Sequence, residues 1–599
     1  MIGRGALNLF LKGLIALIFI AVVFVTFTGG FEIEAGFIHL SMHSIEVALI
    51  GIIFLYLLLI ILTHRRLSGF RRWIGKHKLI ILIILVILLL PPCIAMYMMH
   101  ARTNLHRFES ADALAALKGD KQVIFVGLDG ITFDVIDPLV KEGKLPNLAR
   151  LMDEGTSGVL RSIESYRASV DKTGIWSPTV WTCIATGKKP LRHGITDFIM
   201  PDRTNIAKLT IASSYHRRVK ALWNILSDLH VRSAFVGWWA TWPAERIDGH
   251  MISSHMGLRG LRDRAVSPEG IAEQAGIYKL TYPEDYAETV LTNISAPVDV
   301  DAFIKERFFD IEHCRVREES RLNTFRSVCF QDKYYAEISH YLLKTEQPRF
   351  LYLYIEGTDV VSHLFWEFMV KNDHEKAGLE DCDLERLREV VRNYYIWADE
   401  IVGEIVSNAE EDATVVVASD HGFQTDPRNP HFADHALDGV YIFKGDGIRK
   451  GRRIRYSPVL KRMDLQRRQA SIVDILPTIL YLYGAPVSED LDGRVLTEIF
   501  KKRFLTSNPI VTIDSYEAFD LEKNLKKDIP EIDGEISLDE INKEYMDRMK
   551  SVGYIDGGGT VNKKDPAGEY KKHNNKDQKA LDDIDKEYQE RLKSLQYIQ

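Results

Sequence analysis

Three long apolar runs without charged side chains stand within the first hundred residues. They cover residues 13–31, 47–63 and 79–99. A helix needs about 20 apolar residues to cross a bilayer core, and somewhat shorter runs can suffice. The first run is followed by two others, which argues against a cleaved signal peptide, and residues 79–90 have no polar face, which argues against a buried soluble hairpin. The pattern therefore predicts three transmembrane helices.

The charges around these runs predict their orientation. Arg4 and Lys12 precede the first run, whereas Glu32 and Glu34 follow it. The segment between the second and third runs is basic and contains Arg65, Arg66, Arg71, Arg72, Lys76 and Lys78. By the positive-inside rule, this segment and the N-terminus lie in the cytoplasm. We therefore expect a multi-pass protein of the cell membrane whose later residues face the periplasm or the cell exterior.

From residue 121 onward, short apolar runs alternate with helical patterns. QVIFVGLDG (122–130), RSAFVGWW (232–239), FLYLYIEG (350–357) and TVVVASDHG (414–422) have the pattern of buried parallel strands. Helical patterns lie at 146–155, 334–344 and 387–406. The alternation predicts an α/β fold in which a mostly parallel sheet is sandwiched by helices.

The composition divides the chain into three predicted parts. Residues 1–104 form the membrane region, and residues 105–505 form the α/β domain with an insertion or cap at about 255–335. Residues 506–599 form a tail rich in Lys, Asp, Glu and Asn, in which SLDE (537–540) is a capping box that begins a short helix.

Overall composition excludes several classes of protein. The chain is 46% hydrophobic and 27% charged, which excludes a wholly disordered or fibrous protein. A net charge of −7 gives no reason to expect a nucleic-acid partner. Five cysteines in 599 residues exclude a disulfide scaffold, although Cys314 and Cys329 are compatible with either one disulfide or two free thiols.

Residue types that bind metal ions follow several of the predicted strands. Asp129 ends the first strand pattern, Asp420 and His421 end the last, and Asp359 and His363 follow the third at a spacing that places both on one helical face. His435 precedes another apolar run, and His431 is its rival. Ligands bind at the carboxyl ends of strands in open α/β sheets. Three Asp and three His suit two borderline divalent cations.

A nucleophile is expected within residues 176–198, which offer Ser177, Thr179, Thr182 and Cys183. Pro178 suits the first position of a helix, which would place Ser177 at the N-cap. A hydroxyl needs a base or a metal to become a strong nucleophile. A helix N-terminus would add backbone N–H donors for an attacked anion.

The sequence resembles the alkaline phosphatase superfamily, and within it the type I phosphodiesterase/nucleotide pyrophosphatase branch. The resemblance covers about residues 121–500. It is carried by VGLDG (126–130), SPTVWTCIATGKKPLRHGI (177–195), GTDVVSH (357–363), SDHGF (419–423), HALDG (435–439) and the closing segment 471–494.

The resemblance implies a role for each candidate residue. Asp129, Asp420 and His421 would hold one metal, and Asp359, His363 and His435 would hold the other. Ser177 takes the place of the nucleophile that forms a phospho-enzyme intermediate. Zinc is favoured by the ligands and the family, with manganese as the alternative.

One departure from the family concerns the substrate. Val180 stands where members that act on nucleotides carry an Asn that contacts the phosphate, which argues against a nucleotide. Thr179 or backbone N–H groups would take over that contact.

We expect a membrane-anchored hydrolase of small-molecule or lipid phosphate esters. Two alternatives remain open. Membrane-anchored transferases that pass a phospho-group to a lipid or envelope polymer share the superfamily and this layout, and an inactive binding scaffold could keep the same fold.

Overall fold

The computed structural model describes residues 31–35, 38–42, 121–164, 174–201, 209–257, 279–294, 299–310, 319–370, 381–425, 433–454 and 469–519. The chain divides into two compact units, Met1–His106 and Arg107–Gln599. In the first unit, β1 (Phe31–Ala35) and β2 (Ile38–Met42) pair antiparallel. Within the described ranges, no helix has both the length and the apolar character needed to cross a membrane. The three predicted spans lie outside these ranges apart from Phe31, and the helix at 537–540 lies outside them entirely.

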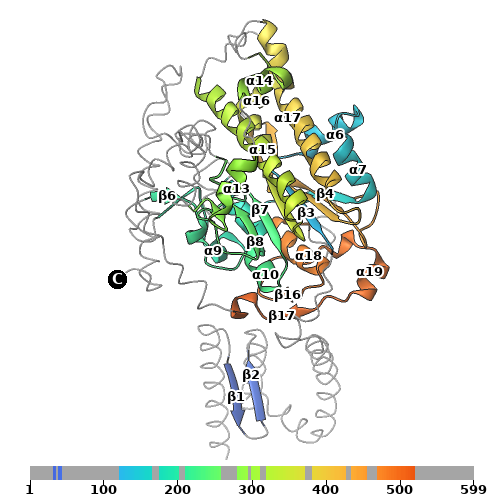
Figure 1. Ribbon diagram of the computed structural model, residues 1–599. Coiled ribbons are helices and arrows are strands. Elements are labelled where there is room, and N and C mark those ends of the chain that lie inside the picture. Colours follow the sequence, from blue (N-terminus) through green and yellow to red (C-terminus); the bar gives the residue numbers. More distant parts are fainter. Residues whose placement is uncertain are drawn as a thin grey trace, which may run out of the picture. The chain divides into compact units, whose positions relative to one another are not determined.

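The second unit is built on a nine-stranded sheet (Figure 1). In spatial order its strands are β15 (Arg452–Ile454), β4 (Thr156–Arg161), β14 (Asp438–Lys444), β11 (Thr414–Ala418), β3 (Val123–Leu128), β10 (Phe350–Ile355), β7 (Ser233–Val236), β8 (Gly249–Ile252) and β9 (Thr281–Tyr282). The five strands from β11 to β8 are parallel, whereas β14 and β9 run antiparallel to their neighbours. The predicted mostly parallel α/β sheet is therefore confirmed.

Both faces of the central strands are covered. Every residue of β3, β10 and β11 is buried. Successive side chains of a strand point to opposite faces, so full burial requires packing on both. This explains why these strands are continuous apolar runs in the sequence and do not alternate with polar residues.

Helices connect the strands. They are α6 (Phe133–Lys141), α7 (Pro146–Glu154), α8 (Ser177–Thr186), α9 (Pro190–His193), α10 (Leu222–Asp228), α13 (Tyr286–Asn293), α14 (Val300–Arg307), α15 (Glu319–Thr345), α16 (Gly357–Val370), α17 (Asp381–Ser407), α18 (Ile475–Leu482) and α19 (Lys502–Ser507). Figure 1 shows the long helices α15, α16 and α17 grouped together, and they pack on one another as well as on the sheet. The three predicted helical patterns lie within α7, α15 and α17 or extend one residue beyond.

Aromatic side chains fill the space between the sheet and the helices α8 and α10. Trp181 of α8 and Trp238 each make ring contacts with Tyr352 of β10, and Trp223 of α10 packs edge-on against Phe235 of β7. Trp238, Trp239 and Trp242 are all buried and belong to this core.

Shorter strands form three two-stranded sheets beside the main one. They are β5 (Ile199–Pro201) with β6 (Leu209–Ile211), β12 (Gly422–Thr425) with β13 (Ala433–Ala436), and β16 (Val487–Ser488) with β17 (Thr512–Ile513). The predicted insertion at 255–335 includes β9, α13, α14 and the first half of α15 among its described parts. Its role as a cap stays a prediction, as do the other domain boundaries, and Cys314 lies outside the described residues.

The segment after residue 505 contributes buried contacts to the second unit. Glu517 forms an ion pair with the buried Lys188, at 3.2 Å, and accepts hydrogen bonds from the backbone N–H of Lys220. The hydroxyl of the buried Tyr516 donates to the carbonyl of Pro486 at 2.6 Å. These contacts tie residues 512–519 to the loops that follow α8 and α18 and to the segment that precedes α10.

A chain that ends at residue 505 is therefore expected to be less stable than one that ends at 519. Its Lys188 keeps Asp490 as a partner at 2.7 Å but loses Glu517, and the surface that Tyr516 covers is exposed. Losing one partner of a buried charge and a buried aromatic ring together should lower the free energy of unfolding by about 3 kcal/mol or more. Denaturant unfolding of the two truncated chains measures this difference, and equal midpoints would contradict it.

Candidate metal centre and nucleophile helix

The register of the central strands brings the predicted acidic ligands to one edge of the sheet. The strands β11, β3 and β10 are adjacent, parallel and in register. Asp129 directly follows β3, Asp420 follows β11 after one residue, and Asp359 lies in the first turn of α16, which follows β10. All three carboxylates are buried. The carboxyl ends of parallel strands thus place side chains that are far apart in sequence side by side.

The predicted histidines reach the same place from different elements. His421 follows Asp420, and His435 lies in β13, opposite Phe423 of β12. His363 lies one turn after Asp359 on α16, and its Nε2 is 3.6 Å from Asp359 Oδ1. Its Nε2 is also 2.8 Å from Nε2 of His435. All six predicted ligands are therefore neighbours, whereas His431 lies outside the described residues.

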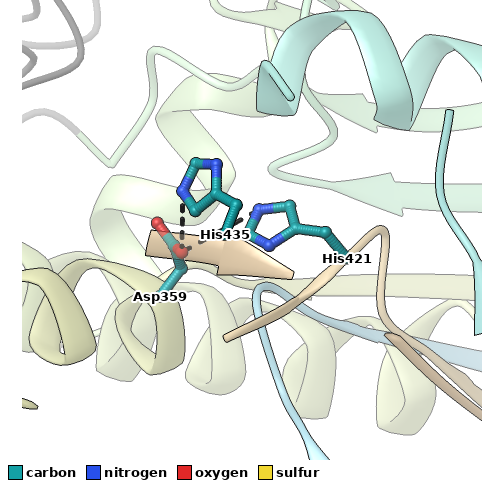
Figure 2. Close-up of side chains that lie close together, drawn as sticks. All are labelled: Asp359, His421 and His435. Atoms are coloured by element: carbon teal, nitrogen blue, oxygen red, sulfur yellow. Dashed lines mark ion pairs between the residues drawn. The ribbon is translucent and has the colours of Figure 1, made fainter. Parts of the chain in front are cut away.

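Two groups within this cluster have ligand atoms close enough to hold a metal ion. One is Asp129, Asp420 and His421, and the other is Asp359, His421 and His435. Figure 2 shows the second group, in which Nε2 of His435 and of His421 lie 3.4 and 3.8 Å from Oδ1 of Asp359. The first group is the set that the family resemblance implies. In the second, His421 takes the place expected for His363.

Unsatisfied buried atoms indicate that the cluster fits cations. Asp129 Oδ1, Asp420 Oδ2 and His421 Nε2 are inaccessible to solvent and form no hydrogen bond of good geometry with any described residue. Buried charged groups without partners are costly, and native proteins pair them or use them as metal ligands. The Nε2 of His421 lies 3.2 Å from Asp129 Oδ1 and 3.6 Å from Asp420 Oδ2, so a single cation could contact all three atoms.

Backbone carbonyls orient two of the imidazoles. Nδ1 of His421 lies 2.9 Å from the carbonyl oxygen of Gly422, and Nδ1 of His435 lies 3.1 Å from that of Ile175. A carbonyl only accepts, so Nδ1 carries the proton in both rings. In the neutral form of each ring the lone pair is then on Nε2, which faces the carboxylates, and this is the tautomer that a metal-binding histidine requires.

The electrostatics of the cluster also favour cations. Burial and then the charge of Asp129 raise the pKa values of Asp359 and Asp420 well above 3.8. Burial acts to raise the pKa of Asp129 as well, but the neighbouring His421 outweighs it and lowers this pKa. Burial lowers the pKa values of His363 and His435. Three carboxylates that resist ionising together become stable as anions when divalent cations neutralise them.

The helix α8 is fixed to this cluster on both sides of Ser177. Two residues before Ser177, the carbonyl of Ile175 accepts the hydrogen bond from His435. Four residues after it, Nε1 of Trp181 donates to Oδ2 of Asp129 at 3.0 Å. The helix begins at Ser177 itself, with Trp176 at the cap position where Ser177 was predicted. The prediction of the N-cap was thus wrong by one residue.

Other side chains of α8 have local roles. The hydroxyls of Thr182 and Thr186 donate to carbonyls one turn earlier, at 2.6 and 2.7 Å. Thr179 is fully buried, and its hydroxyl has no partner among the described residues. The N–H groups of Thr179 and Val180 both bind the carbonyl of Trp176. These two N–H groups are therefore engaged within the helix, which leaves the Thr179 hydroxyl as the better candidate for a phosphate contact.

Cys183 lies deep in the core and does not join the cluster. Its Sγ is 3.3 Å from Nε2 of His193. Burial raises the pKa of the Cys183 thiol, and burial together with Arg217 lowers the pKa of His193 to about 3. A neutral thiol beside a neutral imidazole is a packing contact, because a reactive cysteine needs a lowered pKa.

Several residues around the cluster were missed by the sequence analysis. Asp129 Oδ2 accepts a hydrogen bond from the hydroxyl of Tyr354 in addition to that from Trp181, and Nε1 of Trp239 donates to the Tyr354 oxygen at 2.5 Å. No motif or spacing marks these contacts, because an aromatic residue in a buried strand or helix has the pattern of an ordinary core residue.

Asp332 of α15 was missed as well, because no motif or spacing links it to the predicted ligands. Its carboxylate accepts hydrogen bonds from the N–H groups of Glu356 and Gly357, at 3.1 and 2.8 Å, and from the hydroxyl of Tyr394 at 2.9 Å. Burial raises its pKa to about 7. Asp332 thereby fixes the junction between β10 and α16, two residues before Asp359.

One comparison with known proteins classifies the chain. A sequence model described as "Type I phosphodiesterase / nucleotide pyrophosphatase" matches residues 123–453. No curated protein sequence matches the chain.

Solved structures that match the chain include the following three. A phosphonoacetate hydrolase from Sinorhizobium meliloti 1021 is 16% identical, with 51% of this chain and 57% of that chain covered and a TM-score of 0.32. Human ectonucleotide pyrophosphatase / phosphodiesterase 5 is 11% identical, with 64% and 100% covered and a TM-score of 0.36. A phosphonate monoester hydrolase from Silicibacter pomeroyi is 13% identical, with 64% and 76% covered and a TM-score of 0.36. The chain thus spans little more than half the length of the phosphonoacetate hydrolase.

Proposed function

The chain belongs to the type I phosphodiesterase / nucleotide pyrophosphatase family, and from that premise we propose that it hydrolyses phosphate esters on a two-metal site with Ser177 as the nucleophile. It is a phosphoric ester hydrolase by family. The observation that carries the proposal is the convergence of five buried ligands and His363, with hydrogen bonds that link the cluster to Ile175 and Trp181 on either side of Ser177. Three of the buried ligand atoms have no hydrogen-bond partner among the described residues.

Each set of ligands has a place in the proposal. Asp129, Asp420 and His421 would hold one cation. Asp359 and His435 would hold the second, together with His421 or His363. The anionic oxygens and the neutral Nε2 atoms suit zinc, and manganese is the alternative. When bound, two such cations lower the pKa of a hydroxyl or a water and neutralise phosphoryl oxygens.

The chain's own residues then carry the reaction in two steps. The Ser177 oxygen attacks phosphorus, the substrate's ester bond breaks, and the alcohol leaves with a proton. Thr179 donates its hydroxyl to a phosphoryl oxygen. Water then attacks the phosphorus of phospho-Ser177, which releases phosphate or its monoester and returns a proton to the serine. The fixed position of α8 between Asp129 and His435 keeps the nucleophile in line during both steps.

The cellular setting of the proposal follows from the hydrophobic pattern. Three spans between residues 13 and 99 anchor the protein, with the N-terminus in the cytoplasm and the hydrolase unit outside. The substrate is a small-molecule or lipid phosphate ester, and a lipid is within reach of a membrane-anchored enzyme. The same anchoring would suit a transferase in which an acceptor hydroxyl replaces water in the second step.

Metal removal tests this proposal directly. The full chain in detergent should release p-nitrophenol from bis-p-nitrophenyl phosphate and contain about two divalent ions per chain. A chelator should abolish turnover, and Zn²⁺ or Mn²⁺ should restore it, because the proposed reaction needs the cations to activate the nucleophile and to neutralise the phosphoryl oxygens. The monoester p-nitrophenyl phosphate, assayed in parallel, separates phosphodiesterase from phosphatase activity.

Two other outcomes would contradict hydrolysis. Two bound ions without turnover of either ester would favour the transferase, and addition of candidate hydroxyl acceptors would then be the next assay. A chain that binds no ion and turns over neither ester would favour the binding scaffold.

A further inference from the structure

Two buried donors hold one oxygen of Asp129 and leave the other for a metal ion. Oδ2 accepts hydrogen bonds from the Tyr354 hydroxyl and from Nε1 of Trp181. Oδ1 accepts none from the described residues and lies 3.2 Å from Nε2 of His421. Asp129, Tyr354 and Trp181 are each at most 1% exposed, so water does not compete for these bonds. The carboxylate is thereby fixed in one rotation, with a single oxygen directed at its neighbouring ligand.

The direction of the Tyr354 hydrogen bond is determined by a third residue. Nε1 of Trp239 lies 2.5 Å from the Tyr354 oxygen, and an indole N–H can only donate. The Tyr354 oxygen is therefore an acceptor for Trp239, and its proton points to Asp129. The chain of bonds from Trp239 through Tyr354 to Asp129 has one polarity along its whole length, which strengthens each bond in a buried setting.

Tyr352 provides a built-in comparison. It lies two residues before Tyr354 on β10, so both side chains are on the same face of the sheet. Both rings are buried and both contact Trp181. The hydroxyl of Tyr352, however, has no hydrogen-bond partner among the described residues. Two tyrosines in nearly the same surroundings thus differ in whether the hydroxyl reaches a metal ligand.

We propose that Tyr354 is a positioning residue that orients Asp129 for metal binding, and that Trp181 does the same from the nucleophile helix. Because Trp181 lies on α8, the same carboxylate also fixes this helix relative to the metal. This inference rests on the proposed function, since it requires Asp129 to be a ligand. Outer hydrogen-bond partners of metal ligands typically contribute 10–100-fold to metal affinity.

The test compares Tyr354→Phe with Tyr352→Phe in the full chain. Each metal-free protein is titrated with Zn²⁺ against a chromophoric chelator, and Co²⁺ is added separately to record its visible absorption. Tyr354→Phe should bind one of the two ions about 10–100-fold more weakly than wild type and change the Co²⁺ bands, because the carboxylate loses its orientation. Tyr352→Phe should bind both ions within about twofold of wild type, since it removes a hydroxyl that makes no bond.

The other outcomes are distinguishable. Wild-type affinity in Tyr354→Phe, or equal losses in both variants, would overturn the positioning role while the proposed function stands. A wild type that binds no ion would overturn both. If Tyr354→Phe does not fold, Trp181→Phe makes the same test from the other donor, and an affinity equal to that of wild type in that variant would overturn the inference.

Discussion

Replacing Ser177 with alanine is expected to lower the turnover of phosphate esters at least about a thousandfold while leaving both metal ions in place. Removal of a nucleophile that forms a covalent intermediate typically costs several orders of magnitude in kcat, because the residual rate comes only from the remaining electrostatic stabilisation. Ser177 is buried at the start of α8, where hydrogen bonds at Ile175 and Trp181 flank it. Initial rates and metal content, measured on the same samples, check this prediction.

The control lies on the same helix. Thr182→Val removes a hydroxyl whose bond goes to the Pro178 carbonyl, so it should alter stability without changing the chemistry. Thr179→Val is the discriminating variant, because Thr179 also carries a buried hydroxyl without a partner among the described residues. Full turnover in Ser177→Ala, together with loss of turnover in Thr179→Val, would mean that Thr179 is the nucleophile and Ser177 is not.

The acidic part of the cluster could be predicted because of a physical property of parallel sheets. A strand covered on both faces is a continuous apolar run, so a charged residue at its end marks the point where the chain leaves the core. Asp129 and Asp420 were identified in this way. Because β11, β3 and β10 are neighbours in register, residues at their carboxyl ends meet. Asp359 and His363, which share one face of the helix that follows β10, therefore reach the same edge of the sheet.

Strand direction could not be predicted from the same patterns. β14 has the apolar run of a buried strand, yet it lies antiparallel between β4 and β11. His435 was expected just before this strand, and it lies in the short strand β13, which pairs with β12. Periodicity reports which faces of a strand are buried and carries no information on its neighbour's direction.

Contacts between aromatic residues and Asp129 were also beyond the sequence. Tyr352 and Tyr354 are both buried tyrosines of one strand, and nothing in the local pattern separates them. Their difference depends on Trp239 and Asp129, which are brought to Tyr354 by the packing of separate elements. Hydrogen bonds of this kind follow from tertiary structure alone, whereas strand ends follow from local hydrophobicity.

The second large effect is expected for Asp420→Asn. The change should lower turnover, and it should raise or lower stability depending on whether metal is bound. Oδ2 of Asp420 is buried without a hydrogen bond from the described residues, and Oδ1 accepts one from Gly130. The isosteric change removes an anionic ligand, so turnover should fall at least about a thousandfold and one ion should be lost. Without metal, burial and the charge of Asp129 raise the pKa of Asp420. The neutral amide should then relieve repulsion and stabilise the metal-free protein.

The stability of the metal-free protein should depend on pH because the pKa of Asp420 is raised. A carboxyl whose folded pKa lies above its unfolded value of 3.8 contributes stability below that value, and the contribution is lost as pH rises through the folded pKa. Metal-free wild type should therefore lose stability as pH rises above about 4, and metal-free Asp420→Asn should lose less. With metal at neutral pH, wild type should be more stable than Asp420→Asn, because metal binding stabilises the wild type by mass action. Thermal unfolding of both proteins, with and without chelator, measures which of the two is more stable in each state.

Asp399→Asn separates this effect from the general cost of altering a buried carboxylate. Asp399 accepts hydrogen bonds from the N–H groups of Asn147 and Leu148 at the start of α7, away from the metal cluster. Its replacement turns one of the two accepting oxygens into an NH₂ group that can only donate, so one of these donors loses its partner. Stability should therefore fall by about 1 kcal/mol to the same extent with and without metal. A metal-free Asp420→Asn that is destabilised as much as Asp399→Asn would mean that Asp420 serves packing and local hydrogen bonding. If only Asp420→Asn is more stable than wild type without metal and less stable with it, the buried charge of Asp420 is tolerated because a cation neutralises it.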